Sequence, residues 1–346
     1  MSQTANALDV RAVVKSILDS IDRDREKEII GRRFGLYDRR ETLEQIGELL
    51  GITRERVRQL EKAILARLKA QAAEDQLLQL KSAEKAIIKE LHELGLVATV
   101  INLAQALTEQ DDERTHAHVA LLASISPGLE LIDENDRYRQ AVAIRDKYDE
   151  RKIKQAIKQV IDAIKTVGEP ITAEELHARL SLEHPRHIAA LASISKELAT
   201  LRGLWGLIRW PLVNPKNIRD KIYVILKDNQ KPMHFSDIAK QIKASTFKRK
   251  DVTTQAIHNE LIKDPRFVLI GRGIYALKEW GYKRGTVADV IAEVLKKSGK
   301  PLHRDEIVKR VLKSRRVKET TILLNLQGKP QFKRVAKATY AFDETA

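Results

Sequence analysis

Apolar residues along the first part of the chain recur every three or four positions, which is the spacing of helices with one buried face. The pattern runs from Val10 to Ile21 and resumes from Arg25 to Phe34, where Gly35 supplies a stop signal. The sequence therefore predicts two helices ahead of Gly35.

Two further helices are predicted on either side of Gly51. Thr42 precedes the run LEQIGELL, and Thr53 precedes the run RERVRQLEKAILARLK. Each threonine is a candidate N-cap, because its side-chain oxygen can accept a hydrogen bond from an unpaired amide of the first helical turn. A short helix, a glycine turn and a longer helix form the helix-turn-helix pattern.

Beyond residue 71 the chain repeats one pattern four times, with a period of about 60–70 residues. Each repeat has an amphipathic helix, a turn, two more helices and an apolar tail that alternates as a two-stranded hairpin would. The segment ALLASIS (120–126) of the first repeat returns as AALASIS (189–195) in the second. A turn ending in proline precedes the second helix of the other three repeats, as GEP, QKP and GKP. The predicted helices are Ser82–Leu94, Val100–Leu107 and His116–Ser124; Ile153–Val167, Ala173–Leu180 and Arg186–Leu198; Ile218–Lys227, Ser236–Ile242 and Val252–Ile262; and Val287–Lys297, Arg304–Leu312 and Thr320–Leu326.

Three helices followed by a β-hairpin are typical of a winged helix. A helical solenoid of the tetratricopeptide kind is the alternative, which the β-rich tails oppose. We therefore expect a mainly α protein, with a helix-turn-helix domain followed by tandem winged-helix modules. The expected domains are 1–71, an acidic module at 72–148, modules at 149–214 and 215–282, and a basic module at 283–346.

The junction between the first two domains lacks glycine and proline from Ile52 through Leu94. One helix of about 40 residues would be about 60 Å long, at ~1.5 Å per residue. The stretch from Ala70 to Asp75 offers no strong apolar contact. We therefore predict two helices that meet near Ala72, and a hinge between mobile modules.

Charge is distributed unevenly along the chain. Residues 71–150 hold 8 Lys and Arg against 16 Asp and Glu, whereas residues 213–346 hold 30 against 14. A basic block of this size suits a polyanion, because each neutralised phosphate releases counterions. It could also be a solvated surface that binds nothing specific. The acidic stretch argues against DNA contact there.

The composition excludes several kinds of chemistry. The chain has no cysteine, which removes disulfides, thiolate metal sites and cysteine nucleophiles. His116 and His118 have no suitably spaced partner for a metal, and no nucleophile motif is present. We expect neither an enzyme nor a cofactor, metal or small-molecule substrate. Because the sequence shows no signal peptide and no membrane-spanning run, we also expect a cytoplasmic, nucleoid-associated protein without a membrane partner.

Three blocks carry a resemblance to region 4 of housekeeping sigma factors, over residues 10–70. They are RFGL (33–36), TLEQIG (42–47) and TRERVRQLE (53–61), in the order and spacing of that family. The resemblance implies that the helix after Thr53 enters the major groove of promoter DNA. It also implies contact with the β flap of core RNA polymerase.

The chemistry of this helix is consistent with base reading. Arg54, Glu55, Arg58 and Gln59 lie in its first two turns, next to Thr53. Arginine can donate twice to guanine, glutamine can pair with adenine, and glutamate can accept from cytosine. The other interpretation is an exposed helix whose charges only face solvent. Because two arginines four positions apart repel on a bare helix, we favour DNA contact.

The third repeat resembles the HARE-HTH domain, also found in the δ subunit of bacterial RNA polymerase, over residues 217–280. The resemblance is carried by KPMHFSDIA (231–239), VTTQAIHNEL (252–261) and RFVLIGRGIYAL (266–277). Its third helix would present Thr253, Thr254, Gln255, His258 and Asn259, after the basic run Lys248, Arg249 and Lys250. These groups could contact DNA, although δ relatives bind polymerase instead.

Basic residues elsewhere in the last two repeats complete the predicted DNA-binding set. They are Arg272, in a segment interpreted as a hairpin turn, and Arg315, Arg316 and Lys318.

The sequence thus predicts a sigma-related transcription regulator or initiation accessory factor that reads promoter-like double-stranded DNA and contacts RNA polymerase. An adapter similar to the δ subunit and the DNA-recognition subunit of a restriction-type system are the alternatives.

Overall fold

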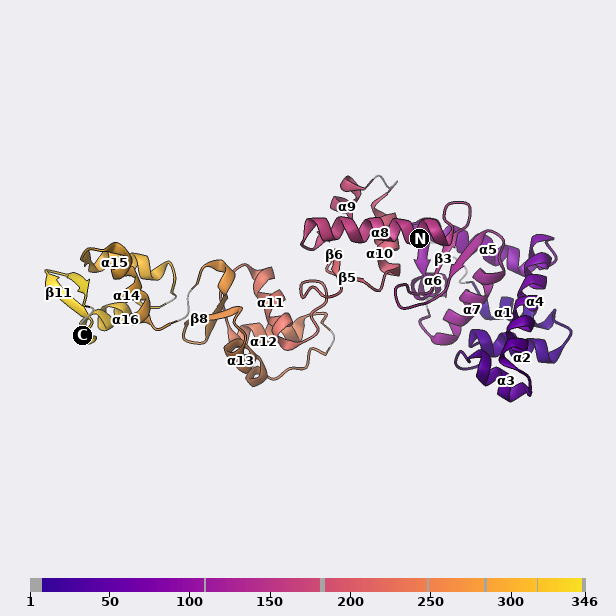
Figure 1. Cartoon of the computed structure of the whole chain (residues 1–346), viewed down its shortest axis with the longest axis horizontal. Helices are drawn as coiled ribbons and strands as arrows, with labels where there is room; N and C mark the ends of the chain where they lie inside the picture. Colours follow the sequence, from indigo (N-terminus) through magenta and orange to yellow (C-terminus); the bar gives the residue numbers. More distant parts are fainter. Residues whose placement is uncertain are drawn as a thin grey trace, which may run out of the picture. The chain divides into compact units, whose positions relative to one another are not determined.

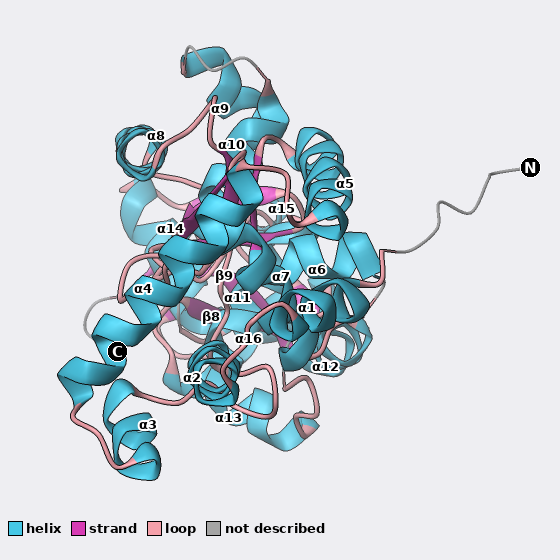
Figure 2. Ribbon diagram, turned by 90° about the vertical axis from the view of Figure 1, so that its right-hand side faces the viewer, coloured by secondary structure: helices cyan, strands magenta, loops and turns pink. Residues whose placement is uncertain are grey.

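The computed structural model describes residues 8–108, 110–180, 184–247, 249–282, 285–315 and 317–343. The chain divides into two compact units, residues 1–209 and residues 210–346. Both are mainly helical with short strands (Figures 1 and 2), which confirms the expected fold class at that level. None of the helices described is long and apolar enough to cross a membrane.

The four helices predicted at the start of the chain are present. They are α1 (Val10–Asp19), α2 (Asp24–Phe34), α3 (Leu43–Leu50) and α4 (Arg54–Ala73). Thr42 forms a capping box with Gln45, and the Thr53 side chain accepts a hydrogen bond from the Arg56 amide. Both predicted N-caps are therefore confirmed.

A close turn joins α3 to α4. Gly51 ends α3 with a φ of 65°, in the left-handed region that favours glycine. Gly47, inside α3, lies so near the turn that a Cβ there would be 2.7 Å from the Ile52 carbonyl oxygen. Glycine at residue 47 thus permits the two helices to approach each other.

The rest of the chain repeats one order of elements four times: helix, strand, helix, helix, strand, strand. The first copy has α5 (Leu78–Leu94), β1 (Val97–Thr99), α6 (Val100–Thr108), α7 (Glu113–Ile125), β2 (Leu129–Ile132) and β3 (Ala141–Ile144); the second has α8 (Glu150–Val167), β4 (Ile171–Thr172), α9 (Ala173–Arg179), α10 (Pro185–Ile194), β5 (Leu198–Leu201) and β6 (Leu204–Leu207). The third has α11 (Ile218–Asn229), β7 (Met233–His234), α12 (Phe235–Ala244), α13 (Thr254–Lys263), β8 (Phe267–Gly271) and β9 (Ile274–Leu277), followed by the short helix η1 (Lys278–Trp280). The fourth has α14 (Val287–Ser298), β10 (Leu302–His303), α15 (Arg304–Leu312), α16 (Glu319–Gly328), β11 (Phe332–Ala336) and β12 (Thr339–Phe342).

Each repeat contains a three-stranded antiparallel sheet, and not the two-stranded hairpin that the sequence predicted. In each sheet, the strand that comes last in the sequence lies in the middle, as in β1-β3-β2 and β10-β12-β11. The added strand comes between the first two helices and is only two or three residues long. A strand that short shows no alternation of apolar and polar residues, so the sequence pattern could not reveal it.

The chain does break between α4 and α5, as predicted. Glu74 ends α4, and Asp75 has a φ of 58° before α5 begins. The predicted mobility of the modules, however, is wrong. Buried residues from Val10 to Ile144 form one hydrophobic core, in which helices of the first segment pack against α5 and α7. Arg11 of α1 also pairs with Asp112 at 3.1 Å.

The second repeat is joined to the first by backbone contacts. An isolated β-bridge links Tyr138 to Ser195. The Arg139 guanidinium donates from Nη1 to the carbonyl oxygens of Ser193 and Ser195, each at 2.6 Å. A Cβ on Gly95 would lie 2.7 Å from the Arg186 carbonyl oxygen. The helix-turn-helix segment and the first two repeats thus belong to a single compact unit.

Candidate nucleic-acid interface

The first half of α4 is exposed on one side and anchored on the other. Val57, Ile64 and Leu68 are buried. The predicted reading residues are all exposed: Thr53, Arg54, Glu55, Arg58 and Gln59. The spacing of 3.6 residues per turn separates the two sets, which leaves a polar face at the start of the helix.

Ion pairs with α2 hold α4 in place. Arg67 Nη2 lies 2.5 Å from Glu26 Oε2, and the Glu26 side chain is only 10% exposed. Arg33 Nε lies 3.1 Å from Glu61 Oε1. Both contacts involve the part of α4 beyond Gln59, so they position the exposed first turns without using their side chains.

Glu55 organises the exposed face. It accepts hydrogen bonds from Arg58 Nε at 2.9 Å and from Arg58 Nη2 at 2.7 Å. Gln59 Nε2 donates to the same carboxylate at 3.4 Å. The hydrogen bond from Arg58 holds the pKa of Glu55 below its ordinary value and raises that of Arg58. The repulsion expected between Arg54 and Arg58 is therefore offset by a carboxylate between them.

These four helices form a helix-turn-helix module. Residues 23–70 match the family model described as Sigma-70, region 4. This segment of the chain is thus of the sigma-70 region 4 type, as its three sequence blocks predicted.

The chain is also similar to individual sigma factors over a short stretch. The chain is 45% identical over 64 residues to the RNA polymerase sigma factor RpoD of two strains of Helicobacter pylori. It is 46% identical over 61 residues to the RNA polymerase sigma factor sigB of Arabidopsis thaliana. These matches cover 18% and 17% of this chain, and only 9% and 10% of the respective relatives.

The third repeat places its predicted residues on α13. Thr254, Gln255 and Asn259 are exposed, with Gln255 Nε2 donating to Asn259 Oδ1 at 3.1 Å. Thr253 is the N-cap, and its hydroxyl accepts from the Ala256 amide. The His258 ring is half-buried, with its centroid 4.9 Å from that of Phe235, so one of its faces packs inside the repeat.

The basic run before α13 is only partly described, because Lys248 lies outside the described residues. Arg249 is exposed with a φ of 53°, and its carbonyl oxygen accepts from Lys221 Nζ at 2.7 Å. Burial lowers the pKa of Lys221. Lys250 is exposed, and its Nζ lies 3.4 Å from the Ser245 carbonyl oxygen.

The structure departs from the prediction at Arg315. This residue is only 6% exposed, and burial lowers its pKa. Its Nη1 donates to the Leu269 carbonyl oxygen at 2.5 Å, and its Nη2 donates to the carbonyl oxygen of Gly285. A guanidinium enclosed in this way cannot reach a phosphate, so Arg315 joins two repeats and does not form part of a DNA-binding surface. Arg316 lies outside the described residues, and Lys318 is exposed at the N-terminus of α16.

The hairpin turns of the second, third and fourth repeats each hold a basic residue, and only the one in the third repeat was identified from the sequence. Arg272 is exposed in the two-residue turn between Gly271 and Ile274, which confirms the hairpin interpretation of this segment. The equivalent turns hold Arg202, between Leu201 and Leu204, and Lys337, between Ala336 and Thr339. Aligning the four repeats at their hairpins would have revealed the other two.

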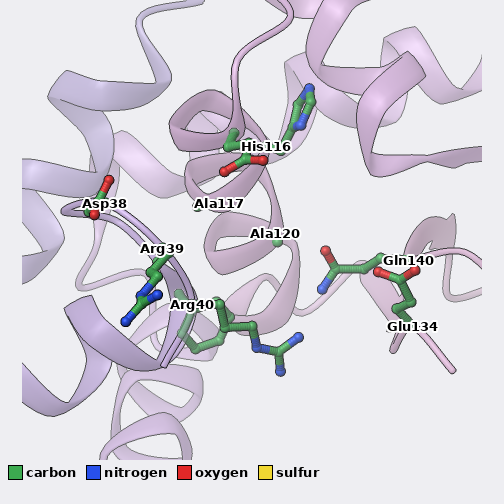
Figure 3. A pocket seen from close by; sticks show the side chains of 11 residues that line it. Asp38, Arg39, Arg40, His116, Ala117, Ala120, Glu134 and Gln140 are labelled. Carbon is green, nitrogen blue, oxygen red and sulfur yellow. The ribbon is translucent and has the colours of Figure 1, made fainter. Parts of the chain in front are cut away.

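A hollow of about 250 Å³ lies where the loop after α2 meets α7 and the β2–β3 loop (Figure 3). Arg39, Arg40, Glu113 and Glu134 give its lining charges of both signs. His116 Nε2 lies 2.9 Å from Asp111 Oδ1, without hydrogen-bond geometry. The described residues that line it include no serine, threonine or cysteine that could act as a nucleophile. Among the described residues, no cluster of three or more metal-ligating side chains is present.

Proposed function

We propose that this protein is a sigma-related, DNA-binding transcription regulator or initiation accessory factor. The observation that carries the proposal is the match of residues 23–70 to sigma-70 region 4, together with the exposed polar face on the first turns of α4. In this proposal the face reads promoter-like double-stranded DNA through the major groove.

The side chains on this face have the chemistry that base reading requires. Arg54 and Arg58 can each donate two hydrogen bonds to guanine, and Gln59 can pair with adenine. Because Arg58 is held by Glu55 in the protein alone, it must leave or share this partner when it meets a base. The pair therefore exchanges one charge-assisted contact for another, and the exchange is favourable only where the base offers matching acceptors.

The four repeats are proposed to be winged-helix modules, the third being of the HARE-HTH kind. Their shared order of helices and strands and their three-stranded sheets support this assignment. The basic third and fourth repeats hold neighbouring DNA through phosphates, using Lys250, Thr254, Gln255, His258 and Arg272. The net charge of residues 213–346, with 30 Lys and Arg against 14 Asp and Glu, supports that role.

RNA polymerase is the proposed protein partner. The relatives that this chain matches over 61–64 residues are named as RNA polymerase sigma factors. The contact that the resemblance implies is with the β flap of core RNA polymerase. The protein is proposed to act in the cytoplasm on the nucleoid, to have no enzymatic activity and to bind no small-molecule substrate.

Footprinting on promoter DNA, with and without core polymerase, tests this function. We expect Arg58→Ala to cost about 1–3 kcal/mol of binding to the preferred sequence and to relax discrimination at one base pair. The matched control is Lys69→Ala, because Lys69 is exposed about three turns further along α4. Equal losses for R58A on every sequence would restrict Arg58 to a phosphate contact. A footprint that appears only with polymerase and survives R58A would favour an adapter instead.

A further inference from the structure

The hairpin of the fourth repeat, β11–β12, carries an exposed cluster of cations. Lys333 and Arg334 lie in β11, and Lys337 lies in the turn that follows; all three side chains are exposed. Successive side chains of a strand point to opposite faces, so Lys333 and Arg334 extend from the two sides of the hairpin. The tip of this hairpin is therefore positively charged on both faces.

No ion pair between these three cations and a carboxylate is found among the described residues. Arg334 Nε only donates to the nearby Ala336 carbonyl oxygen, at 3.3 Å. Many other basic side chains of the molecule do have such partners, as Arg310 has Glu306 at 2.6 Å. Like charges held together without counter-charges repel one another, which is a cost that a bound polyanion would remove.

Protection of a sheet edge does not explain the cluster. β11 is an edge strand, and lysine on an edge can block unwanted pairing with another chain. The strands at the same edge of the second and third repeats, however, are β5 (LATL) and β8 (FVLIG), which contain no lysine or arginine. The fold evidently does not need a charged edge strand, so the cations of β11 are specific to the fourth repeat.

The third helix of the same repeat has no cation that could pair with a phosphate. α16 has the sequence ETTILLNLQG, without a lysine or arginine. Its most exposed apolar residue, Leu324, is 68% exposed, and a leucine can neither pair with a phosphate nor donate to a base edge. The exposed uncharged polar residues of α16 are Thr320 and Gln327, at opposite ends of the helix, whereas the third helix of the third repeat exposes Thr254, Gln255 and Asn259 close together and after a basic run.

We propose that the β11–β12 hairpin of the fourth repeat binds the phosphate backbone of duplex DNA without reading sequence, while α16 does not read bases. The cations on its two faces fit a groove, because both walls of a groove carry phosphates. This inference rests on the proposed function in one respect, namely that the chain binds DNA. It assigns to this repeat a contact through a strand and a turn, and not through its third helix.

The test measures the affinity of the full chain for a random-sequence duplex over a range of salt concentrations. The variant is Lys333→Gln, Arg334→Gln and Lys337→Gln together. Since the logarithm of the binding constant changes by about −0.9 per phosphate contact for each logarithmic unit of salt, we expect the slope to become shallower by about 2–3. The loss of affinity should be the same on unrelated sequences, and the thermal unfolding curve should be unchanged.

Two control variants separate this contact from general attraction. Lys300→Gln, Lys309→Gln and Lys313→Gln remove the same charge from exposed positions of the same repeat, and should change the slope by less than half as much. Thr320→Ala with Gln327→Ala, on the exposed side of α16, should leave the slope unchanged.

Several outcomes would overturn the proposal. They are equal effects of the two triple variants, an unchanged salt slope in the hairpin variant, or, in a parallel measurement, a hairpin variant that loses affinity for single-stranded RNA but not for duplex DNA. The proposed function is tested separately. If R58A has no effect on promoter DNA while the hairpin variant weakens binding to all duplexes, the promoter-reading role fails and the hairpin contact stands.

Discussion

Glu55 is the residue that most directly controls the proposed reading face. Its carboxylate is bound twice by Arg58 and once by Gln59, so these three exposed side chains form one hydrogen-bonded group. A negative charge at this position also repels phosphates. Glu55 therefore opposes binding to DNA that lacks the right base, which is a means of gaining specificity at the expense of affinity.

This reasoning predicts the effect of Glu55→Gln. We expect affinity for random-sequence DNA to rise about three- to tenfold, because one repulsive charge is removed and Arg58 is released. The preference for the promoter-like sequence should fall. Because the pKa of Glu55 is already below its ordinary value, it is ionised throughout about pH 6–8, and the effect should not vary with pH over that range.

The control is Glu48→Gln. Glu48 is exposed on α3, and its substitution removes the same charge. Fluorescence anisotropy with two unrelated duplexes and one promoter duplex measures the three affinities. An unchanged or reduced affinity of E55Q for random DNA would contradict the role assigned to Glu55.

At the residue scale, the sequence predicted what depends on near neighbours and missed what depends on distant ones. The caps at Thr42 and Thr53 and the exposure of Arg58 follow from a few adjacent positions. The burial of Arg315 follows from the Leu269 carbonyl oxygen, 46 positions away. No local pattern distinguishes an arginine that meets such a carbonyl from one that faces solvent.

At the scale of elements, the pair α3 and α4 depends on close backbone approach at one glycine. The Gly47→Ala variant would place a methyl group 2.7 Å from the Ile52 carbonyl oxygen, which is part of the turn and not a flexible side chain. The turn must therefore open to accept the methyl group, and this would tilt the first turns of α4.

We expect Gly47→Ala to lower the free energy of unfolding by about 1–3 kcal/mol, as overpacking typically does. DNA binding should weaken as well. Gly51→Asn is the informative control, because residue 51 has a positive φ that asparagine tolerates and has open space around it. Denaturant unfolding followed by circular dichroism gives both values, and a stable G47A variant would show that the turn adjusts freely.

Helices were predictable as elements because each presents a buried face over several turns. The boundaries of α2, α3 and the start of α4 lie at residues with clear stop or cap chemistry, such as Gly35 and Thr53. The strands between the first and second helices were not predictable. β4, β7 and β10 have two residues each and are recognised only by their partners across the sheet.

At the scale of the whole molecule, the shared core of the helix-turn-helix segment and the first repeat replaces the expected hinge. Leu68 of α4 and Leu121 of α7 are both buried in this core. The sequence could not reveal it, because the apolar face of α4 can be covered equally well by its own domain or by the next. Which helices share a core is decided by tertiary packing.

Cooperative unfolding of the helix-turn-helix segment with the first repeat follows from this core. We expect Leu121→Ala, in α7, to cost about 2–5 kcal/mol and to increase amide hydrogen exchange in α4 as well as in α7. Ile307→Ala in α15, which belongs to the separate core of the fourth repeat, should leave α4 unaffected. Independent modules would instead lose protection in α7 alone.

In the described part of the chain, each sheet is assembled from strands of its own repeat, and the short strand added to the hairpin comes before the second helix. A repeat of this kind can be duplicated or deleted in a gene without leaving an unpaired strand in its neighbour. The bridge between Tyr138 and Ser195 is an exception, and it makes the first two repeats depend on each other. Over evolutionary time, homologous chains should therefore vary in the number of later repeats while they keep the first two as a pair.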